Sequence, residues 1–369
     1  MEEIQLLEIY NLFGNSRDGP ISRSALGKLQ EWGLIPQEGV LKCKKGHDLR
    51  LSPYSNIDGW MWRCQKVYRG RQRGSCDVKR SIRTGTFFER SQLSMCKIVV
   101  FCFMWVRRGG LLRDIWKETK INKRTAVDWS NFCREVVVYS SFQRELEIGG
   151  PGTIVEIDES KIGKRKYHRG HRVEGQCVFG GIERGSNKCF IVPVEDRSKE
   201  TLLPLIKRYI RPGTLIVSDC WKAYRTLNKE GYIHRTVNHS LHFVDPKTGW
   251  HTNGIEGLWR HLKVSLSAYN RRKIFFNGYV QRFIFFRWCK ANKKDPLLEF
   301  FRFAGQLYNP ANLTADSERE EFRVGSSETP MILEVEVGSN ERECSETDFS
   351  TDSSESSQWN PPPAKKRRT

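Results

Sequence analysis

Three carboxylates stand where an active site built on a β-sheet would need them. Asp158 follows the β-type run Thr153–Ile157, and Asp219 follows a second such run, Thr214–Ser218. The carboxyl ends of the strands in an open α/β sheet meet at one edge, where such folds place their sites. Glu256 lies 37 residues after Asp219, in a segment with a helical pattern. We therefore expect the three acids to converge at that edge.

The chemistry that such a set performs is metal-assisted phosphoryl transfer. Mg²⁺ and Mn²⁺ prefer oxygen ligands, and Mg²⁺ takes only a few carboxylates. Two such ions, about 4 Å apart, can activate an attacking oxygen and stabilise the leaving one. Each acid also has a plainer explanation: an Asp after a strand often caps the next helix, and Asp219 could cap one that begins near Trp221. Three acids at the ends of elements in a basic chain favour the catalytic interpretation.

The charge of the chain indicates a polyanionic partner. Its 369 residues carry a net charge of +19, and the 13 acidic and seven basic residues from Leu313 onward leave the preceding part at +25. Such a charge, with eleven Trp interleaved among Lys and Arg, suits double-stranded DNA, although a merely soluble basic surface is the alternative. No apolar run reaches the roughly 18–20 residues of a membrane span, and the chain begins with no signal-peptide pattern. We expect an intracellular protein that does not enter membranes.

A second group of residues has the composition of a zinc site. Cys43, His47, Cys64 and Cys76 fall within 34 residues, and structural Zn²⁺ is often held by three Cys and one His. Segment 41–90 has little apolar material, so a metal would supply the stability that a core cannot. The spacing departs from a regular pair of CxxC motifs. Free thiols in a basic loop are therefore the alternative, and His47 is the ligand that the spacing supports least.

The elements that must position these residues follow in a clear order. Segments Leu111–Thr119 and Lys123–Val138 outline a helix-turn-helix, with Lys123 and Arg124 at the end that would enter a major groove. Many helical hairpins of this form do not contact DNA. From Gly152 onward, strands and helices alternate in the manner of an α/β domain with a mixed sheet. The predicted organisation is a helical entry (1–40), a zinc-ribbon-like DNA-binding module (41–90), a helix-turn-helix region (91–146), a catalytic α/β domain (150–303) and a disordered acidic tail (314–369).

Two basic segments have their own predicted roles. The loop after Asp158 carries a set of cations that we expect to grip phosphate, with a solvated surface loop as the alternative; they are Lys164, Arg165, Lys166, Arg169 and Arg172. The end of the tail has the form of a nuclear import signal, which predicts a nuclear location and an import receptor as partner; its residues are Lys365, Lys366, Arg367 and Arg368. Within the tail, Ile332, Leu333 and Val335 form a β-prone strip that could add as a strand to SUMO.

Three motifs give the chain a family resemblance. Ile154–Ser160, Val217–Tyr224 and His251–Trp259 resemble, in this order, the motifs of the DDE transposases of the Merlin superfamily and their bacterial insertion-sequence relatives. The resemblance extends from about Leu41 to about Phe303. It implies an RNase H-like catalytic domain, and it places the family's catalytic acids on Asp158, Asp219 and Glu256. It also implies two Mg²⁺ or Mn²⁺ ions per active site.

The same resemblance implies further properties. They are a zinc ribbon ahead of the catalytic domain with one structural Zn²⁺, cut-and-paste transposition at terminal inverted repeats, and assembly as at least a dimer. His251 and Asn253 match the third motif, and we interpret them as orienting groups or DNA contacts. A domesticated nuclear DNA-binding protein without transposition activity is the alternative, and an RNase H-type nuclease acting on other substrates is a third. The presence of all three acids favours the transposase.

Overall fold

The computed structural model describes most of the first 310 residues. The described ranges are 6–14, 19–68, 74–107, 112–144, 147–162, 175–186, 188–237, 244, 246, 249–266 and 276–310. Contacts divide the chain into units 1–321 and 322–369, and every described residue lies in the first. The basic loop at 163–174 and the tail from 314, with its import signal and SUMO strip, lie outside the described residues. Within the described ranges, no helix combines the length and the apolar character that crossing a membrane requires.

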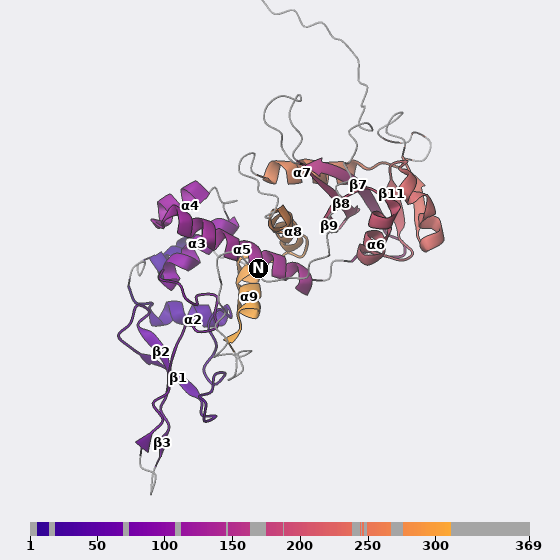
Figure 1. The fold of residues 1–369 in the computed structure, drawn as a ribbon. Coiled ribbons are helices and arrows are strands. Elements are labelled where there is room, and N and C mark those ends of the chain that lie inside the picture. The colour runs from indigo at the N-terminus through magenta and orange to yellow at the C-terminus, as the bar shows by residue number, and fades with distance from the viewer. Residues whose placement is uncertain are drawn as a thin grey trace, which may run out of the picture. The chain divides into compact units, whose positions relative to one another are not determined.

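A five-stranded mixed sheet dominates the second half of the described chain (Figure 1). Its strands are β7 (Ile154–Ile162), β8 (Gln176–Glu183), β9 (Cys189–Val194), β11 (Leu215–Ser218) and β12 (Ile233–Thr236). They lie in the spatial order β12-β11-β7-β8-β9. Strand β8 is antiparallel to both of its neighbours, whereas β11 is parallel to β7 and to β12. One antiparallel strand among four parallel ones, in this order, is the RNase H-like topology, so the predicted fold class is confirmed.

Helices pack on both faces of this sheet. They are α6 (Lys199–Tyr209), the 3₁₀-helix η3 (Lys222–Glu230), α7 (Asn253–Ser265) and α8 (Phe276–Ala291). Because side chains alternate along a strand, Val155 and Ile157 of β7 join the core that contains α6 and η3. Ile162 belongs to the other set of β7 side chains and joins the core that contains α7 and α8. Asp158 is in the same alternate set as Ile162, so it faces α7.

Strand β7 is longer than the sequence indicates. We predicted a strand that ends at Ile157, with Asp158 directly after it. The strand instead continues to Ile162 and pairs with β8 throughout, with Asp158 opposite Gly180. The polar residues after Ile157 conceal the strand pattern, but the ladder with β8 satisfies their backbone groups. The predicted position of Asp158 at a strand end was therefore wrong, whereas Asp219 does follow β11 directly.

The described residues outside the five-stranded sheet and its helices form short helices and small sheets. A three-stranded sheet has the order β1-β2-β5. Strands β10 and β6 form a parallel pair, and β3 and β4 form an antiparallel pair. The elements are α1 (Leu6–Ile9), the π-helix η1 (Tyr10–Gly14), α2 (Arg23–Glu31), β1 (Leu49–Pro53), β2 (Trp60–Cys64), β3 (Val67–Tyr68), β4 (Gly74–Ser75), β5 (Lys79–Ser81), β6 (Ile148–Gly149) and β10 (Ile210–Arg211). A buried ion pair joins Asp58, in the turn between β1 and β2, to Arg83, which follows β5; their closest atoms are 2.6 Å apart. Arg83 also donates to the carbonyls of Ser91 and Leu93, just ahead of the next helix.

Four longer helices accompany these elements: α3 (Met95–Arg107), α4 (Leu112–Thr119), α5 (Lys123–Gln143) and α9 (Pro296–Leu307). Helix α3 is buried over most of its length, and it shares one apolar core with α5. Helix α9 comes from the far end of the described chain, yet Phe300 and Phe301 belong to that same core. The apolar core of the first half is thus completed by residues that follow the α/β sheet in sequence.

Helices α4 and α5 form the predicted helical pair. Asn122 occupies the N-cap of α5, where its side chain accepts a hydrogen bond from the backbone N–H of Arg124 at 2.9 Å. This cap fixes where α5 begins, as the sequence predicted. Lys123 and Arg124 are exposed, and the Lys123 Nζ lies 4.6 Å from the centre of the Trp116 ring. Contact of these cations with DNA stays a prediction.

Candidate active site and candidate metal centre

Two of the predicted acids meet between neighbouring strands. Strands β7 and β11 are adjacent and parallel, so Asp158 in β7 and Asp219 after β11 come together. Their carboxylate oxygens and one from Glu159 all lie within 4.8 Å of one another. Among the described residues, neither Asp158 nor Asp219 forms an ion pair with Lys or Arg. A close group of three carboxylates fits a divalent cation, which prefers oxygen ligands.

The third predicted acid borders the same site from the helical side. Glu256 lies exposed in the first turn of α7 and accepts a hydrogen bond from the Thr252 hydroxyl at 3.3 Å. It is not part of the close group of three carboxylates. It does line an open pocket of about 550 Å³ together with Asp158, and the other lining residues are Ser160, Trp259, Arg260, Lys263 and Val264. Asp158 is the carboxylate common to both sets, so the pocket that Glu256 lines adjoins the close carboxylate group.

The protonation of Asp158 reflects this environment. Burial, together with the negative charges of Glu159 and Asp219, raises the pKa of Asp158 to about 7. The Trp259 indole donates a hydrogen bond to Asp158 at 2.9 Å, and this bond opposes the shift. A cation bound here would favour the ionised carboxylate and reverse the shift.

Glu159 is a residue that the sequence analysis missed. It is 8% exposed and points to the face of β7 opposite Asp158, where it accepts hydrogen bonds from Tyr224 and, at 3.3 Å, from Arg197. The Arg197 guanidinium lies 4.1 Å from the centre of the Trp221 ring. Burial raises the pKa of Glu159, although these hydrogen bonds oppose the shift. Its position directly after Asp158 was the available signal, but the alternation of side chains along a strand would have argued against a shared site.

The segment that carries Asp219 is held at several points. The backbone N–H of Trp221 donates to Asp219 at 3.0 Å, but η3 begins only at Lys222, so Asp219 does not cap that helix. The preceding residue, Ser218, is fully buried and donates to the Asp219 carbonyl at 2.8 Å. The His234 Nε2 lies 2.8 Å from the Ser218 hydroxyl oxygen. Because the Ser218 proton is already donated to the Asp219 carbonyl, His234 is the donor in this second contact. The Asp219 backbone is thus connected through the Ser218 hydroxyl to His234, so these hydrogen bonds link the end of β11 to β12.

Helix α7 touches Asp158 through Trp259, and a glycine makes room for that ring. Gly180 lies opposite Asp158 in the ladder of β7 and β8. A Cβ at this position would lie 2.7 Å from the tip of the Trp259 ring and 2.9 Å from the Phe190 carbonyl oxygen. Only glycine therefore leaves space for the indole that contacts Asp158.

The two remaining residues of the third motif lie at the start of α7. His251 is half-buried, and Arg184 donates to its carbonyl at 2.5 Å. The His251 Nδ1 lies 3.3 Å from the same guanidinium and 3.5 Å from the carboxylate of Glu156. Asn253 is exposed and is the first residue of the helix. His251 has the surroundings of an orienting group, and its role and that of Asn253 stay predictions.

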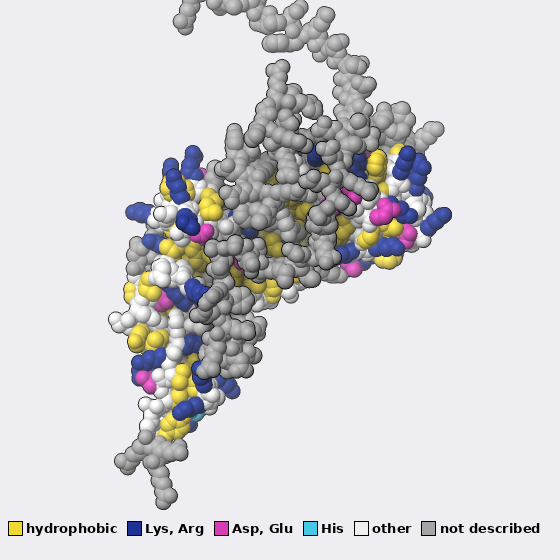
Figure 2. Space-filling view, viewed as in Figure 1, with side chains coloured by type: hydrophobic (Ala, Val, Ile, Leu, Met, Phe, Trp, Pro, Cys, Tyr) yellow, Lys and Arg dark blue, Asp and Glu magenta, His cyan; other side chains and the backbone are white. Residues whose placement is uncertain are grey.

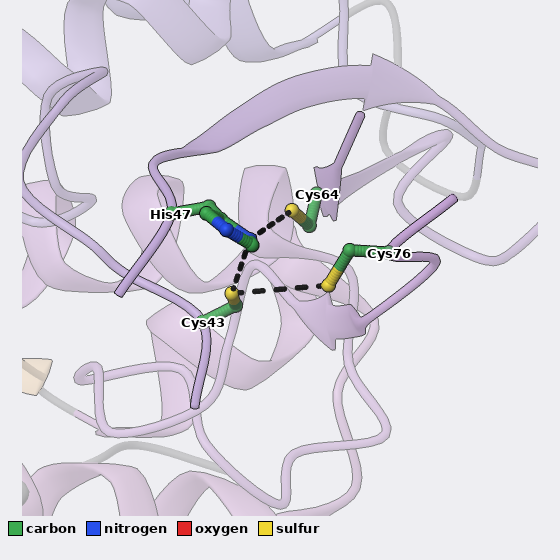
Figure 3. Close-up of side chains that lie close together, drawn as sticks. All are labelled: Cys43, His47, Cys64 and Cys76. Atoms are coloured by element: carbon green, nitrogen blue, oxygen red, sulfur yellow. Dashed lines mark hydrogen bonds between the residues drawn. The ribbon is translucent and has the colours of Figure 1, made fainter. Parts of the chain in front are cut away.

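The predicted zinc ligands come together in the first half of the chain (Figure 3). One ligand atom from each of Cys43, His47, Cys64 and Cys76 lies within 4.8 Å of the others. The three Cys are buried, and His47 is half-buried. The loop before β1, the end of β2 and the segment after β4 supply them, so a metal here would join three separate segments of the chain.

The distances in this group fit a tetrahedral ion. With ordinary zinc–ligand lengths, two sulfurs in a tetrahedron are about 3.8 Å apart, and a sulfur and a nitrogen are about 3.6 Å apart. The Cys43 and Cys76 sulfurs are 3.9 Å apart, and the His47 Nδ1 lies 3.5 Å from the Cys43 sulfur and 3.7 Å from the Cys64 sulfur. The contacts drawn in Figure 3 are thus the edges expected of a ligand tetrahedron. His47, which the spacing supported least, takes part in two of them.

Comparison with known proteins agrees with this geometry. An RNase H-like sheet with acids on β7, after β11 and on α7 is the arrangement that the resemblance to DDE transposases implies. Residues 148–288 match the ISXO2-like transposase domain family. The chain therefore contains a DDE transposase domain, and the recognition made from its motifs is confirmed.

Two curated relatives were found. An uncharacterised transposase-like protein of Haemophilus influenzae is 31% identical over 83 residues, which are 22% of this chain and 66% of that protein. The male abnormal protein mab-31 of Caenorhabditis elegans is 24% identical over 204 residues, which are 51% of this chain and 47% of that protein. The chain thus spans less than two thirds of the length of each.

Solved structures of retroviral integrases are also similar. The catalytic core domain of the HTLV-2 integrase in complex with magnesium has 13% identity and a TM-score of 0.23, covering 40% of this chain and 98% of that chain. The simian T-cell lymphotropic virus intasome in complex with the PP2A regulatory subunit B56 gamma has 12% identity and a TM-score of 0.23, covering 58% and 70%. Both scores are low, and the fold assignment depends on the strand order described above.

Proposed function

We propose that this chain is a DNA transposase that binds the terminal inverted repeats of its element and performs metal-dependent strand cleavage and strand transfer. The observation that carries the proposal is that Asp158 lies in a close carboxylate group with Asp219 and in a pocket with Glu256, within a region that matches a transposase domain family. The fold alone would not suffice, because function is carried by sites and not by folds.

The proposed mechanism assigns each acid a place. Asp158 would be a ligand of both metal ions, since it belongs to the group with Asp219 and to the pocket with Glu256. Two Mg²⁺ or Mn²⁺ ions, when bound, would supply Lewis-acid activation of the attacking water or 3′-hydroxyl and stabilisation of the leaving oxygen. Arg260 and Lys263 line the same pocket and would hold the phosphates that flank the reacting one.

DNA binding would depend on cations outside the site. Lys and Arg side chains spread over the described parts of the face in Figure 2, and Lys123 and Arg124 stand exposed at the start of α5. The group of Cys43, His47, Cys64 and Cys76 would hold one structural Zn²⁺ and so stabilise the zinc-ribbon-like module at residues 41–90. Assembly as at least a dimer on two ends, entry into the nucleus and contact with SUMO are parts of the same proposal.

The test uses the chain and a DNA fragment with the inverted repeats that flank its gene. Asp158→Asn, Asp219→Asn and Glu256→Gln should each lose detectable cleavage in Mg²⁺ while keeping their affinity in a mobility-shift assay, because binding rests on distributed cations. The matched control is Glu195→Gln, an exposed acid of the same domain, which should cleave normally. Specific binding without cleavage by the unaltered chain would overturn the proposal and favour the domesticated DNA-binding protein.

A further inference from the structure

Strand β7 carries another carboxylate, two residues before Asp158. Glu156 is 1% exposed and does not line the pocket that Asp158 and Glu256 share. Its Oε1 accepts a hydrogen bond from the Nε of Arg184 at 2.6 Å. Its Oε2 accepts a hydrogen bond from the backbone N–H of Ile255 at 3.0 Å. Both carboxylate oxygens of Glu156 therefore accept hydrogen bonds, one from Ile255 at the start of α7 and one from Arg184, which also contacts that segment.

The bond to Ile255 does the work of a helix cap. The first amides of a helix have no partner within it, and a side-chain oxygen at the N-cap usually accepts from the third helical residue. Thr252 occupies the N-cap of α7 but makes no such bond. Glu156 supplies the missing acceptor from a strand 99 residues earlier in the chain, and its negative charge also suits the positive end of the helix dipole.

The chain leaves room for this contact at one glycine. A Cβ on Gly254 would lie 2.7 Å from the Glu156 Oε2. Arg184 reinforces the arrangement, since it binds the Glu156 carboxylate and also donates to the His251 carbonyl at 2.5 Å. The segment from His251 to Ile255 is thus held to the sheet from two sides.

These contacts fix the position of Glu256. Glu256 directly follows Ile255, and Trp259, which lies one turn later, is bonded to Asp158 at 2.9 Å. The turn that presents Glu256 is therefore attached to β7 at both of its ends, by Glu156 and by Asp158. A shift of the first attachment would move the Glu256 carboxylate relative to Asp158.

We propose that Glu156 is a positioning residue, which sets the distance between Glu256 and Asp158 by capping α7 with its buried carboxylate. This inference rests on the proposed function, because it assumes that Asp158 and Glu256 bind metal ions for catalysis. Its test does not, because Mn²⁺ binding is measured separately from cleavage. Glu156 itself would touch neither metal nor DNA. Groups that orient metal ligands in this way typically change metal affinity about 10–100-fold when they are removed.

The experiment measures Mn²⁺ binding by calorimetry and, separately, cleavage as a function of Mg²⁺ concentration. Glu156→Ala removes charge and acceptor, and Glu156→Gln keeps an acceptor for Ile255. We expect Glu156→Ala to weaken Mn²⁺ binding about 10–100-fold, with a smaller loss in Glu156→Gln and no change in DNA affinity. The matched control is Glu183→Gln, because Glu183 also accepts from a backbone amide, that of Gly149 at 2.7 Å, but lies away from α7.

The outcomes separate a positioning role from a structural one. A lower melting temperature with unchanged Mn²⁺ affinity in Glu156→Ala would overturn the inference. If Glu156→Ala does not fold, Glu156→Gln and Gly254→Ala provide the same comparison, and unchanged Mn²⁺ affinity in both would overturn it. Should the unaltered chain bind Mn²⁺ without cleaving DNA, the proposed function fails while the calorimetric comparison still decides the role of Glu156.

Discussion

The close packing of Gly180 against Trp259 allows a quantitative prediction. In Gly180→Ala the new Cβ would lie 2.7 Å from the Trp259 ring tip and 2.9 Å from the Phe190 carbonyl oxygen, both far inside ordinary contact. The ring is 5% exposed and is bonded to Asp158, and the carbonyl belongs to the backbone of β9, so neither neighbour moves freely. Overpacking of this kind costs about 1–3 kcal/mol. If the ring swings away, loss of its bond to the carboxylate adds about 1.5–3 kcal/mol.

The assay is urea unfolding followed by circular dichroism, with the free energy of unfolding compared between variants. The matched control is Gly27→Ala, because Gly27 is exposed within α2 and its Cβ would meet nothing within 4 Å. Alanine there should raise the free energy of unfolding by about 0.5–1 kcal/mol. Adding Trp259→Phe to Gly180→Ala should recover part of the loss, since the smaller ring relieves the clash. A Gly180→Ala protein as stable as the unaltered chain would refute this account of the site.

Two further predictions concern metal and pH. The freshly purified chain should contain about one Zn²⁺, and Cys64→Ser should lose this ion together with thermal stability. The control is Cys220→Ser, which changes an exposed Cys and should keep the ion. Elemental analysis that finds no zinc in the unaltered chain would contradict the assignment. In the metal-free protein the pKa of Asp158 is raised from 3.8 to about 7, so its stabilising contribution is fully present below pH 3.8 and is lost as the pH rises through 7. Asp158→Asn should remove this part of the dependence of stability on pH. The Mn²⁺ affinity of the unaltered chain should increase up to about pH 7. If stability depends on pH identically in both proteins, Asp158 does not titrate in that range.

The sequence by itself determined the features that depend on local pattern and residue type. The alternation of strands and helices predicted the mixed sheet, and Asn122 predicted the start of α5. The three Cys and one His within 34 residues predicted a metal-binding group, because structural Zn²⁺ is often held by that set of ligands. The order of the motifs was enough to recognise a transposase domain. Each of these signals is carried by residues close together in the chain or by composition.

Only the tertiary structure decided how the acids are held. Strand β7 continues past Asp158 because β8 pairs with it, and no local preference of its polar residues indicates this. The cap that Glu156 places on α7 joins residues 99 positions apart, and the space that Gly180 leaves for Trp259 is set by two elements that meet across the sheet. Such contacts depend on register and on side-chain packing between distant segments. Local sequence contains neither, so the residue types of the site were readable in advance and its geometry was not.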